Sequence, residues 1–136
     1  MNRTTLWITR LATCVAIGGI AAAVGSCVSD RSTTSVVDPA GCNVQLPSEA
    51  FGSTIVIIRN FAFTPAQINV RAGTKVTWVN CGAPGDAAHT STSDGGVWAS
   101  PLLEPGATFT QDFATSGSFP FHCEPHPSMT GTVTVN

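Results

Sequence analysis

The sequence predicts an all-β domain built as a sandwich of antiparallel sheets, and three observations lead to this prediction. Charged residues make up only 10% of the 136 residues, and Gly, Pro, Ser and Thr are frequent, which is typical of a β-rich domain with many turns. Short alternating or β-branched runs follow one another between turn signals. No segment after the N-terminal region shows the period of a helix. The length suits one domain.

Residues 1–26 resemble a signal peptide of the lipoprotein type. Arg3 and Arg10 flank a short polar start, and Leu11 to Val24 is apolar and rich in Ala and Gly, but too short for a spanning helix. Small residues then precede Cys27, and the sequence VGSC resembles the bacterial lipobox, whose cysteine is lipidated and begins the mature protein. An ordinary signal peptide cut nearby and an uncleaved anchor are the alternatives. Under each of these three interpretations the folded domain is exported.

Residues 27–40 are expected to form a lipidated cysteine followed by a flexible tether, and residues 41–136 the folded domain. The polar segment Ser29 to Pro39 has little to bury, which suits a tether. Thr54 to Arg59 is β-branched and apolar on both faces, as in a strand buried within a sandwich.

The remaining strands are predicted from alternation between turn residues. Gly73, Pro105-Gly106 and Ser116-Gly117 mark turns, and Phe63 to Pro65 is read as a break. Trp78 and Phe121 are expected to be core residues. The predicted strands are Gln67 to Val70, Lys75 to Asn80, Ala107 to Phe113, Phe119 to Cys123 and Thr130 to Val135.

Three potential metal ligands lie on the short connection between the last two predicted strands. Cys123, His126 and Met129 follow one another with two residues between neighbours, and thiolate, imidazole and thioether are ligands that suit copper. A copper site with two imidazole ligands would need one more histidine besides His126. His122 directly precedes Cys123 on a strand, so its side chain points to the opposite face. His89 lies in a long polar loop, Cys81 to Asp94. Taken singly, these residues could equally be a buried thiol, a core methionine and a loop histidine.

Taken together, the four residues make the chain resemble the cupredoxins, the small blue copper proteins, from about Thr54 to Val135. The segment FTPAQINVRAGTKVTWVN is similar to the family's second and third strands. FHCEPHPSMTGTVTV is similar to its ligand loop and last strand, in the short form of amicyanin rather than the longer form of plastocyanin and pseudoazurin. The resemblance implies a Greek-key β-sandwich of about seven to eight strands.

The resemblance also implies a role for each site residue. His89, Cys123 and His126 would bind one copper ion in a trigonal set, and Met129 would be the weak axial ligand. Thr90 is the expected backbone donor to the Cys123 thiolate, and Pro125, which lacks an N–H group, cannot donate to it. His126 is the expected port for electrons.

The other cysteines are then expected to have separate roles. Cys14 is removed with the signal peptide, and Cys27 is the lipidation candidate. Cys42 and Cys81 remain, in an exported and oxidising setting where pairing is expected, so we predict a disulfide between them. The amicyanin pattern has no such pair.

The leading functional hypothesis is a type 1 copper protein that carries single electrons between redox partner proteins as a monomer. The lipid on Cys27 would hold it at the membrane of the cell envelope, in the periplasm or on the outer surface. Copper storage, delivery or resistance is the alternative. Copper oxidases and nitrite reductases need further copper sites, and three histidines cannot build one, so we expect no enzyme activity. A net charge of −2 without a basic patch argues against binding of nucleic acid.

Overall fold

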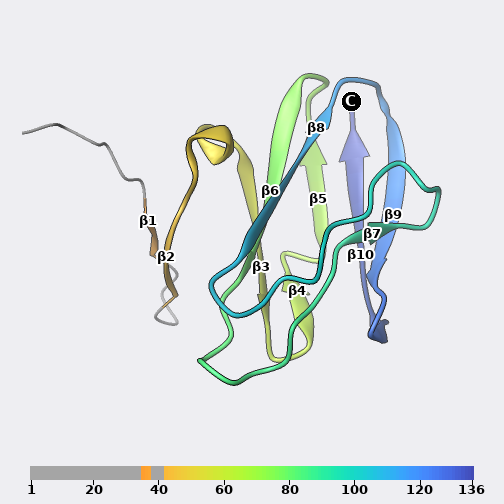
Figure 1. Ribbon diagram of the computed structural model, residues 1–136. Helices are drawn as coiled ribbons and strands as arrows, with labels where there is room; N and C mark the ends of the chain where they lie inside the picture. Colours follow the sequence, from red (N-terminus) through yellow and green to blue (C-terminus); the bar gives the residue numbers. More distant parts are fainter. Residues whose placement is uncertain (1–34, 38–41) are drawn as a thin grey trace, which may run out of the picture. The chain divides into compact units, whose positions relative to one another are not determined.

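The computed structural model describes residues 35–37 and 42–136, and nearly half of these residues belong to two four-stranded β-sheets (Figure 1). No helix in these two ranges is long and apolar enough to cross a membrane. The strands are β1 (Ser35–Val37), β2 (Asn43–Gln45), β3 (Thr54–Arg59), β4 (Ala62–Thr64), β5 (Gln67–Val70), β6 (Thr74–Asn80), β7 (Thr92–Ser93), β8 (Thr108–Phe113), β9 (Gly117–Cys123) and β10 (His126–Val135), with one 3-10 turn, η1 (Ser48–Ala50).

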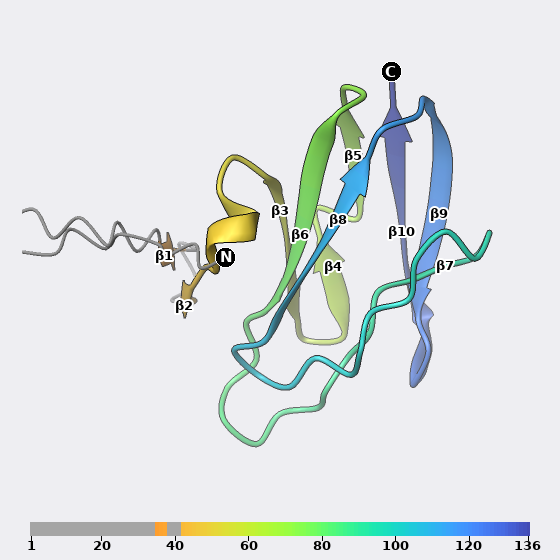
Figure 2. The same ribbon diagram turned by 45° about the horizontal axis from the view of Figure 1, so that its top comes forward.

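The two sheets form a β-sandwich, which confirms the predicted fold class. One sheet has the strand order β4-β3-β6-β8 and the other β5-β10-β9-β7, and Figure 2 shows them as separate layers. The expectation of purely antiparallel sheets is wrong, because β3 pairs with β6, and β5 with β10, in parallel. Parallel neighbours require the chain to leave a sheet and return. Between β3 and β6 the chain does so by crossing to the other sheet as β5. Residue alternation carries no information about strand direction.

Most predicted strands lie where the sequence placed them. The predicted bounds of β3 and β5 are those of the structure, and β6 and β8 differ from their predictions by one residue at the start. The sequence missed β4 and β7, and also β1 and β2, which pair with each other. The residues of β4 were read partly as a break, yet Asn60 and Phe61 turn the chain so that β4 pairs back on β3.

The inner faces of both sheets supply one hydrophobic core. Trp78 of β6 and Phe121 of β9 are fully buried, and their rings meet edge to face with centroids 5.4 Å apart. Gly131 of β10 lies against Phe121, and a Cβ atom there would clash with that ring and lie 2.8 Å from the Ala66 carbonyl oxygen. The strand can pass this close to the core only because the residue has no side chain.

A second, smaller core covers the outer face of the sheet that contains β3. The segment from Cys42 to Ala50 packs there against Val79 and Cys81, with Ile55 and Ile57 at its edge. This segment explains why Thr54 to Arg59 is apolar on both faces. The chain also contains a disulfide between Cys42 and Cys81, which joins this segment to the residue that follows β6.

Candidate metal centre

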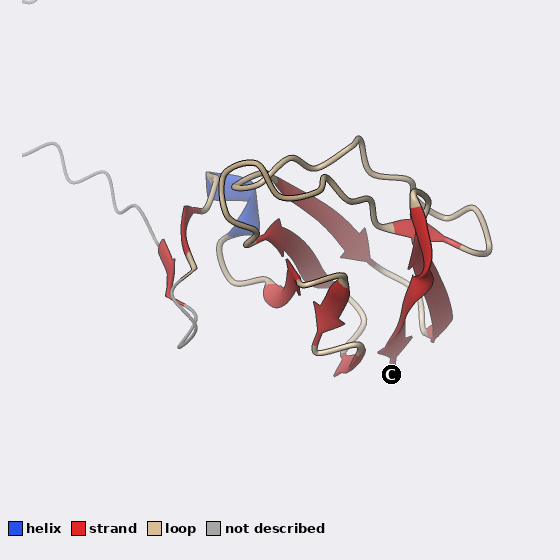
Figure 3. Cartoon of the chain, turned by 90° about the horizontal axis from the view of Figure 1, so that it is seen from below, coloured by secondary structure: helices blue, strands red, loops and turns tan. Residues whose placement is uncertain are grey.

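Three connections gather at the end of the sandwich that lies lowest in Figure 1, and Figure 3 views the molecule from that side. They are the β3–β4 turn, the long segment that follows β6, and the tight β9–β10 turn. Because β9 ends at Cys123 and β10 begins at His126, these two residues pair directly across the turn. The pairing is irregular from His126 to Thr130. Within this irregular stretch Met129 is buried, whereas the two residues before it are exposed.

His89 reaches the same place from the segment after β6. A pair of backbone hydrogen bonds with Leu103, 3.0 and 2.7 Å long, fixes its backbone, and its side chain is only 4% exposed. The Nδ1 atom of His89 lies 3.6 Å from the Cys123 sulfur and 3.1 Å from Nδ1 of His126. The Cys123 sulfur is also 3.6 Å from Nδ1 of His126. The structure therefore brings together two imidazoles and one thiol from distant parts of the chain.

The triangle formed by these three atoms has the size that a metal ion requires. A point in its plane and equidistant from the three atoms lies about 2.0 Å from each, against roughly 2.0–2.3 Å for bonds from a first-row metal such as zinc to imidazole nitrogen and thiolate sulfur. Two imidazoles and a thiolate in a trigonal arrangement are the donor set of a blue copper site. Met129 is buried in the same core cluster as Cys123. The residues present thus fit one copper ion.

Thr90 links the two walls of this site. Its backbone N–H donates to the Cys123 sulfur over 3.3 Å, and its hydroxyl accepts a hydrogen bond of 2.8 Å from the backbone N–H of Glu124. Cys123 itself is fully buried, whereas Pro125 is exposed and offers no N–H group. The hydrogen bond to the sulfur comes from a backbone N–H group that the fold already holds in place, so it helps to position the sulfur independently of a metal.

Several interactions hold the segment that carries His89 in place. Some of them come from Asn80, which the sequence analysis did not single out. Asn80 is fully buried, and its side-chain amide donates to the Leu103 carbonyl at 2.9 Å and accepts from the Gly82 N–H at 2.9 Å. Asparagine is common beside turns at the end of a strand. Its residue type therefore did not indicate that Asn80 would hold the His89 segment in place.

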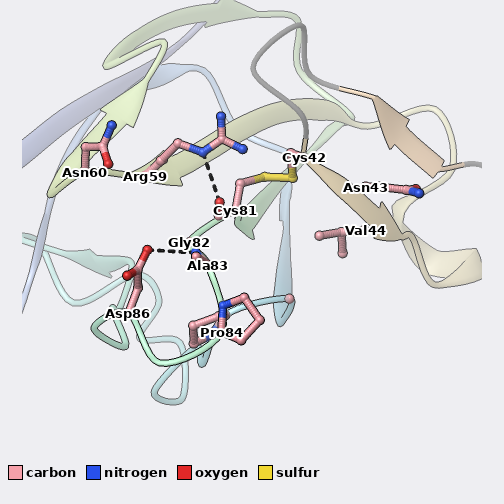
Figure 4. A pocket seen from close by; sticks show the side chains of 12 residues that line it. Cys42, Asn43, Val44, Arg59, Asn60, Cys81, Gly82, Ala83, Pro84 and Asp86 are labelled. Atoms are coloured by element: carbon pink, nitrogen blue, oxygen red, sulfur yellow. Dashed lines mark hydrogen bonds between the residues drawn. A yellow bond between two sulfur atoms is a disulfide. The ribbon is translucent and has the colours of Figure 1, made fainter.

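Figure 4 shows a disulfide and two hydrogen bonds that also hold this segment in place. The disulfide holds Cys81, and the Arg59 side chain donates from Nε to the Cys81 carbonyl at 3.0 Å. Further along, the Ala83 N–H donates to the Asp86 carboxylate at 2.7 Å. The first part of the long loop is thus anchored by a covalent bond and by hydrogen bonds.

His122 lies apart from the site. Its Nδ1 atom contacts the carboxylate of Asp94, from the turn after β7. The predicted outward direction of its side chain agrees with this contact.

The sequence analysis did not consider Phe61, yet its ring contacts both His89 and His126. Cys27, the predicted signal peptide and most of the predicted tether lie outside the described residues. The described part of the tether, β1, is a strand paired with β2.

Burial gives the apo-protein a pH-dependent stability. Desolvation, with a smaller contribution from the charge of His126, holds the pKa of His89 below its ordinary value of 6.5. The unfolded chain then binds more protons than the folded one, so stability is full above about pH 6.5 and is lost as the pH falls toward the folded pKa. Urea unfolding of the apo-protein between pH 8 and 5 should show this loss, and His89→Gln should show a flatter profile. Parallel profiles for the two proteins would contradict the expectation.

Comparisons with known proteins agree on one family. The family model for copper binding proteins of the plastocyanin/azurin family matches residues 52–136. Amicyanin from Paracoccus denitrificans is 29% identical over 131 residues, which cover 93% of this chain and 96% of that protein. Amicyanin-alpha from Methylorubrum extorquens is 33% identical over 86 residues, or 62% of this chain and 72% of that protein.

Solved structures show the same likeness. The Cu(I) form of a methionine-to-alanine variant of amicyanin superposes with a TM-score of 0.57 at 28% identity, over 62% of this chain and 83% of that one. The portion of the chain that carries the two sheets and the three converging donor atoms is the portion that resembles these proteins.

Proposed function

Because the chain belongs to the plastocyanin/azurin family of copper-binding proteins, the cupredoxins, we propose that it works as a type 1 copper electron carrier at the cell envelope. Membership of this family supports binding of one copper ion and transfer of electrons. The observation that carries the finer proposal is the convergence of His89, Cys123 and His126, whose donor atoms lie within 4.8 Å of one another.

Four side chains would hold the metal. His89 and His126 would bind through Nδ1 as neutral imidazoles, Cys123 as a thiolate, and the buried Met129 as a weak thioether ligand. A bound copper ion would supply a centre that gains and loses one electron. The chain's own contribution is rigidity, since Thr90, Asn80 and the disulfide hold the donors in one arrangement. Little movement between oxidation states favours fast electron transfer.

His126 is the proposed port for the electron. It is half-buried, whereas His89 is almost fully covered, and the prolines on both sides of it are exposed. A donor or acceptor protein that docks over the β9–β10 turn would therefore come closest to the metal at this imidazole. The partners proposed are other redox proteins, and the chain is proposed to act as a monomer without enzyme activity of its own.

The location rests on the sequence. We propose that residues 1–26 are removed, that Cys27 carries a lipid, and that residues 27–40 connect it to the domain at residues 41–136. The disulfide between Cys42 and Cys81 supports an oxidising compartment. Mass spectrometry of the N-terminal peptide of the mature protein tests the proposal: a lipid-modified Cys27 is expected at the terminus, and an unmodified terminus at another residue would contradict it.

Electron transfer and copper handling make different predictions for the loaded protein. As an electron carrier it should give a reversible one-electron wave in voltammetry and fast self-exchange between its Cu(I) and Cu(II) forms. Slow self-exchange together with ready transfer of copper to a chelator or to another protein would favour storage or delivery instead.

Replacing Pro125 with Ala should raise the reduction potential. The substitution supplies a backbone N–H group two residues after the thiolate, and a further hydrogen bond to sulfur stabilises the electron-rich reduced site. A bond worth about 1 kcal/mol corresponds to roughly 40 mV for a one-electron couple. Voltammetry of Pro125→Ala measures the shift. Pro127→Ala, on the other side of His126, is the matched control and should change the potential less. An unchanged or lower potential for Pro125→Ala would count against the idea.

A further inference from the structure

The β3–β4 turn beside the metal centre has an unusual sequence for its shape. Arg59 and Ala62 pair across the two strands, so Asn60 and Phe61 alone form the turn. Both have positive φ angles, 50° and 55°, as in a type I′ hairpin turn. Asparagine is well suited to the first of these positions. Glycine is strongly preferred at the second, because a bulky side chain is strained in left-handed backbone. Phe61 occupies the position where turn geometry alone favours glycine.

The strained backbone places the Phe61 ring against both imidazoles. Its centroid lies 4.8 Å from that of His126 and 5.5 Å from that of His89, and both contacts are edge to face, with interplanar angles of 86° and 85°. Aromatic pairs favour this arrangement. The residue nevertheless remains 58% exposed, so it gains little from burial. The contacts with the two histidines are its main interactions with other rings.

A hollow lies next to the turn and borders the Phe61 side chain. It has a volume of about 430 Å³ and is lined by Phe61, His89, Asn80 and Asp86, among others. Polar groups on its wall suit water, and it reaches one of the two imidazoles. Phe61 lines the hollow and its ring contacts His126, which does not line it.

We propose that Phe61 is a positioning residue for the copper centre, whose ring holds the His89 and His126 imidazoles in place and limits the access of water to the metal. The inference rests on the proposed ligand set. Backbone strain that persists beside a functional site, with a ring directed at the site, is the pattern expected when the residue serves the site rather than the fold.

The test compares two glycine substitutions in the same turn. Phe61→Gly removes the ring and places glycine where the turn favours it, so the apo-protein should unfold within about 3 °C of the wild type or at a higher temperature. Asn60→Gly leaves the ring in place and is the matched control. Both variants are loaded with copper and compared with the wild type.

Two measurements on the loaded proteins address the proposed role. Transfer of Cu(I) to excess bathocuproine disulfonate should be about threefold to tenfold faster for Phe61→Gly, the range expected from loss of an aromatic pair. Its reduction potential should fall, because water near the metal favours the more highly charged Cu(II) state. Asn60→Gly should match the wild type in both. In the apo-protein, NMR should show contacts between the Phe61 ring and the His126 imidazole protons.

The possible outcomes separate this inference from the functional proposal. Wild-type transfer rate and potential for Phe61→Gly would show that the ring does not serve the metal. A lower unfolding temperature with both properties unchanged would assign it to the fold alone, and would equally refute the proposal. If Cys123→Ser keeps a blue copper site, the ligand assignment is wrong and the inference fails with it. If Cys123→Ser loses the blue site while Phe61→Gly behaves as the wild type, only the inference fails.

Discussion

Replacing Cys123 with Ser is expected to abolish the intense visible absorption of the copper-loaded protein. The intensity of a blue copper site comes from mixing between the thiolate and Cu(II), and a hydroxyl does not replace that donor. Cys123 is one of the three converging donors and is fully buried, and it is the free thiol of the part of the chain that the structure describes. Absorption spectroscopy after loading with Cu(II) measures the change, and any bound copper should give only weak bands.

The fold itself should survive this substitution. Serine is similar in size to cysteine, and its hydroxyl can accept the hydrogen bond that the Thr90 N–H now gives to sulfur. The free energy of unfolding of the apo-protein should therefore fall by only about 1 kcal/mol. His122→Ala is the neighbouring control, because His122 contacts Asp94 and should leave the blue absorption intact. A blue Cys123→Ser variant would remove the basis of the proposed function.

Removal of the disulfide is expected to have the largest effect on stability. Replacing both Cys42 and Cys81 with Ser opens a link between residues 39 positions apart. Loss of this constraint on the unfolded chain should lower the free energy of unfolding by about 4 kcal/mol. Both sulfur atoms also belong to the smaller core on the outer face of the sheet, so their replacement by hydroxyl groups adds to the loss. Urea unfolding of the apo-protein measures the difference.

The disulfide should matter for the metal site as well as for the fold. Cys81 begins the segment that carries His89, and Asn80 and Arg59 bind the same segment by hydrogen bonds. With these bonds intact the double variant should still bind copper and turn blue, but release copper faster. A free energy of unfolding within about 1 kcal/mol of the wild type would show that the unfolded chain is not appreciably constrained by this link.

The sequence predicted those parts of the fold that depend on local pattern. The bounds of β3 and β5 could be predicted because Thr54 to Ile58 is an unbroken run of β-branched residues that ends at Arg59, and Gln67–Val70 alternates between turn signals. The parallel pairing of β3 with β6 could not be predicted, because it depends on how the chain crosses between sheets. The hairpin at Asn60–Phe61 could not be predicted either, since its second residue is not the expected glycine.

The residues of the candidate site likewise fall into those that the local sequence identifies and those that only the fold brings together. Cys123, His126 and Met129 were identified by residue type and spacing, since they lie close together in the sequence and thiolate, imidazole and thioether suit copper. The neighbours that hold the site, Asn80 and Phe61, carry no such chemical signature. Their contribution appears only when the fold brings segments from different strands together, with Asn80 bound to Leu103 and Phe61 packed on His126.

The optical spectrum of the domain tests the central claim most directly. The fragment of residues 28–136, loaded with Cu(II), should bind one copper ion per chain and turn blue, with a strong thiolate-to-copper absorption band. The band should disappear on reduction to Cu(I) and return on oxidation. A colourless protein, or one that binds copper without this band, would contradict the assignment of Cys123 and the two histidines as the ligands of an electron-transfer site.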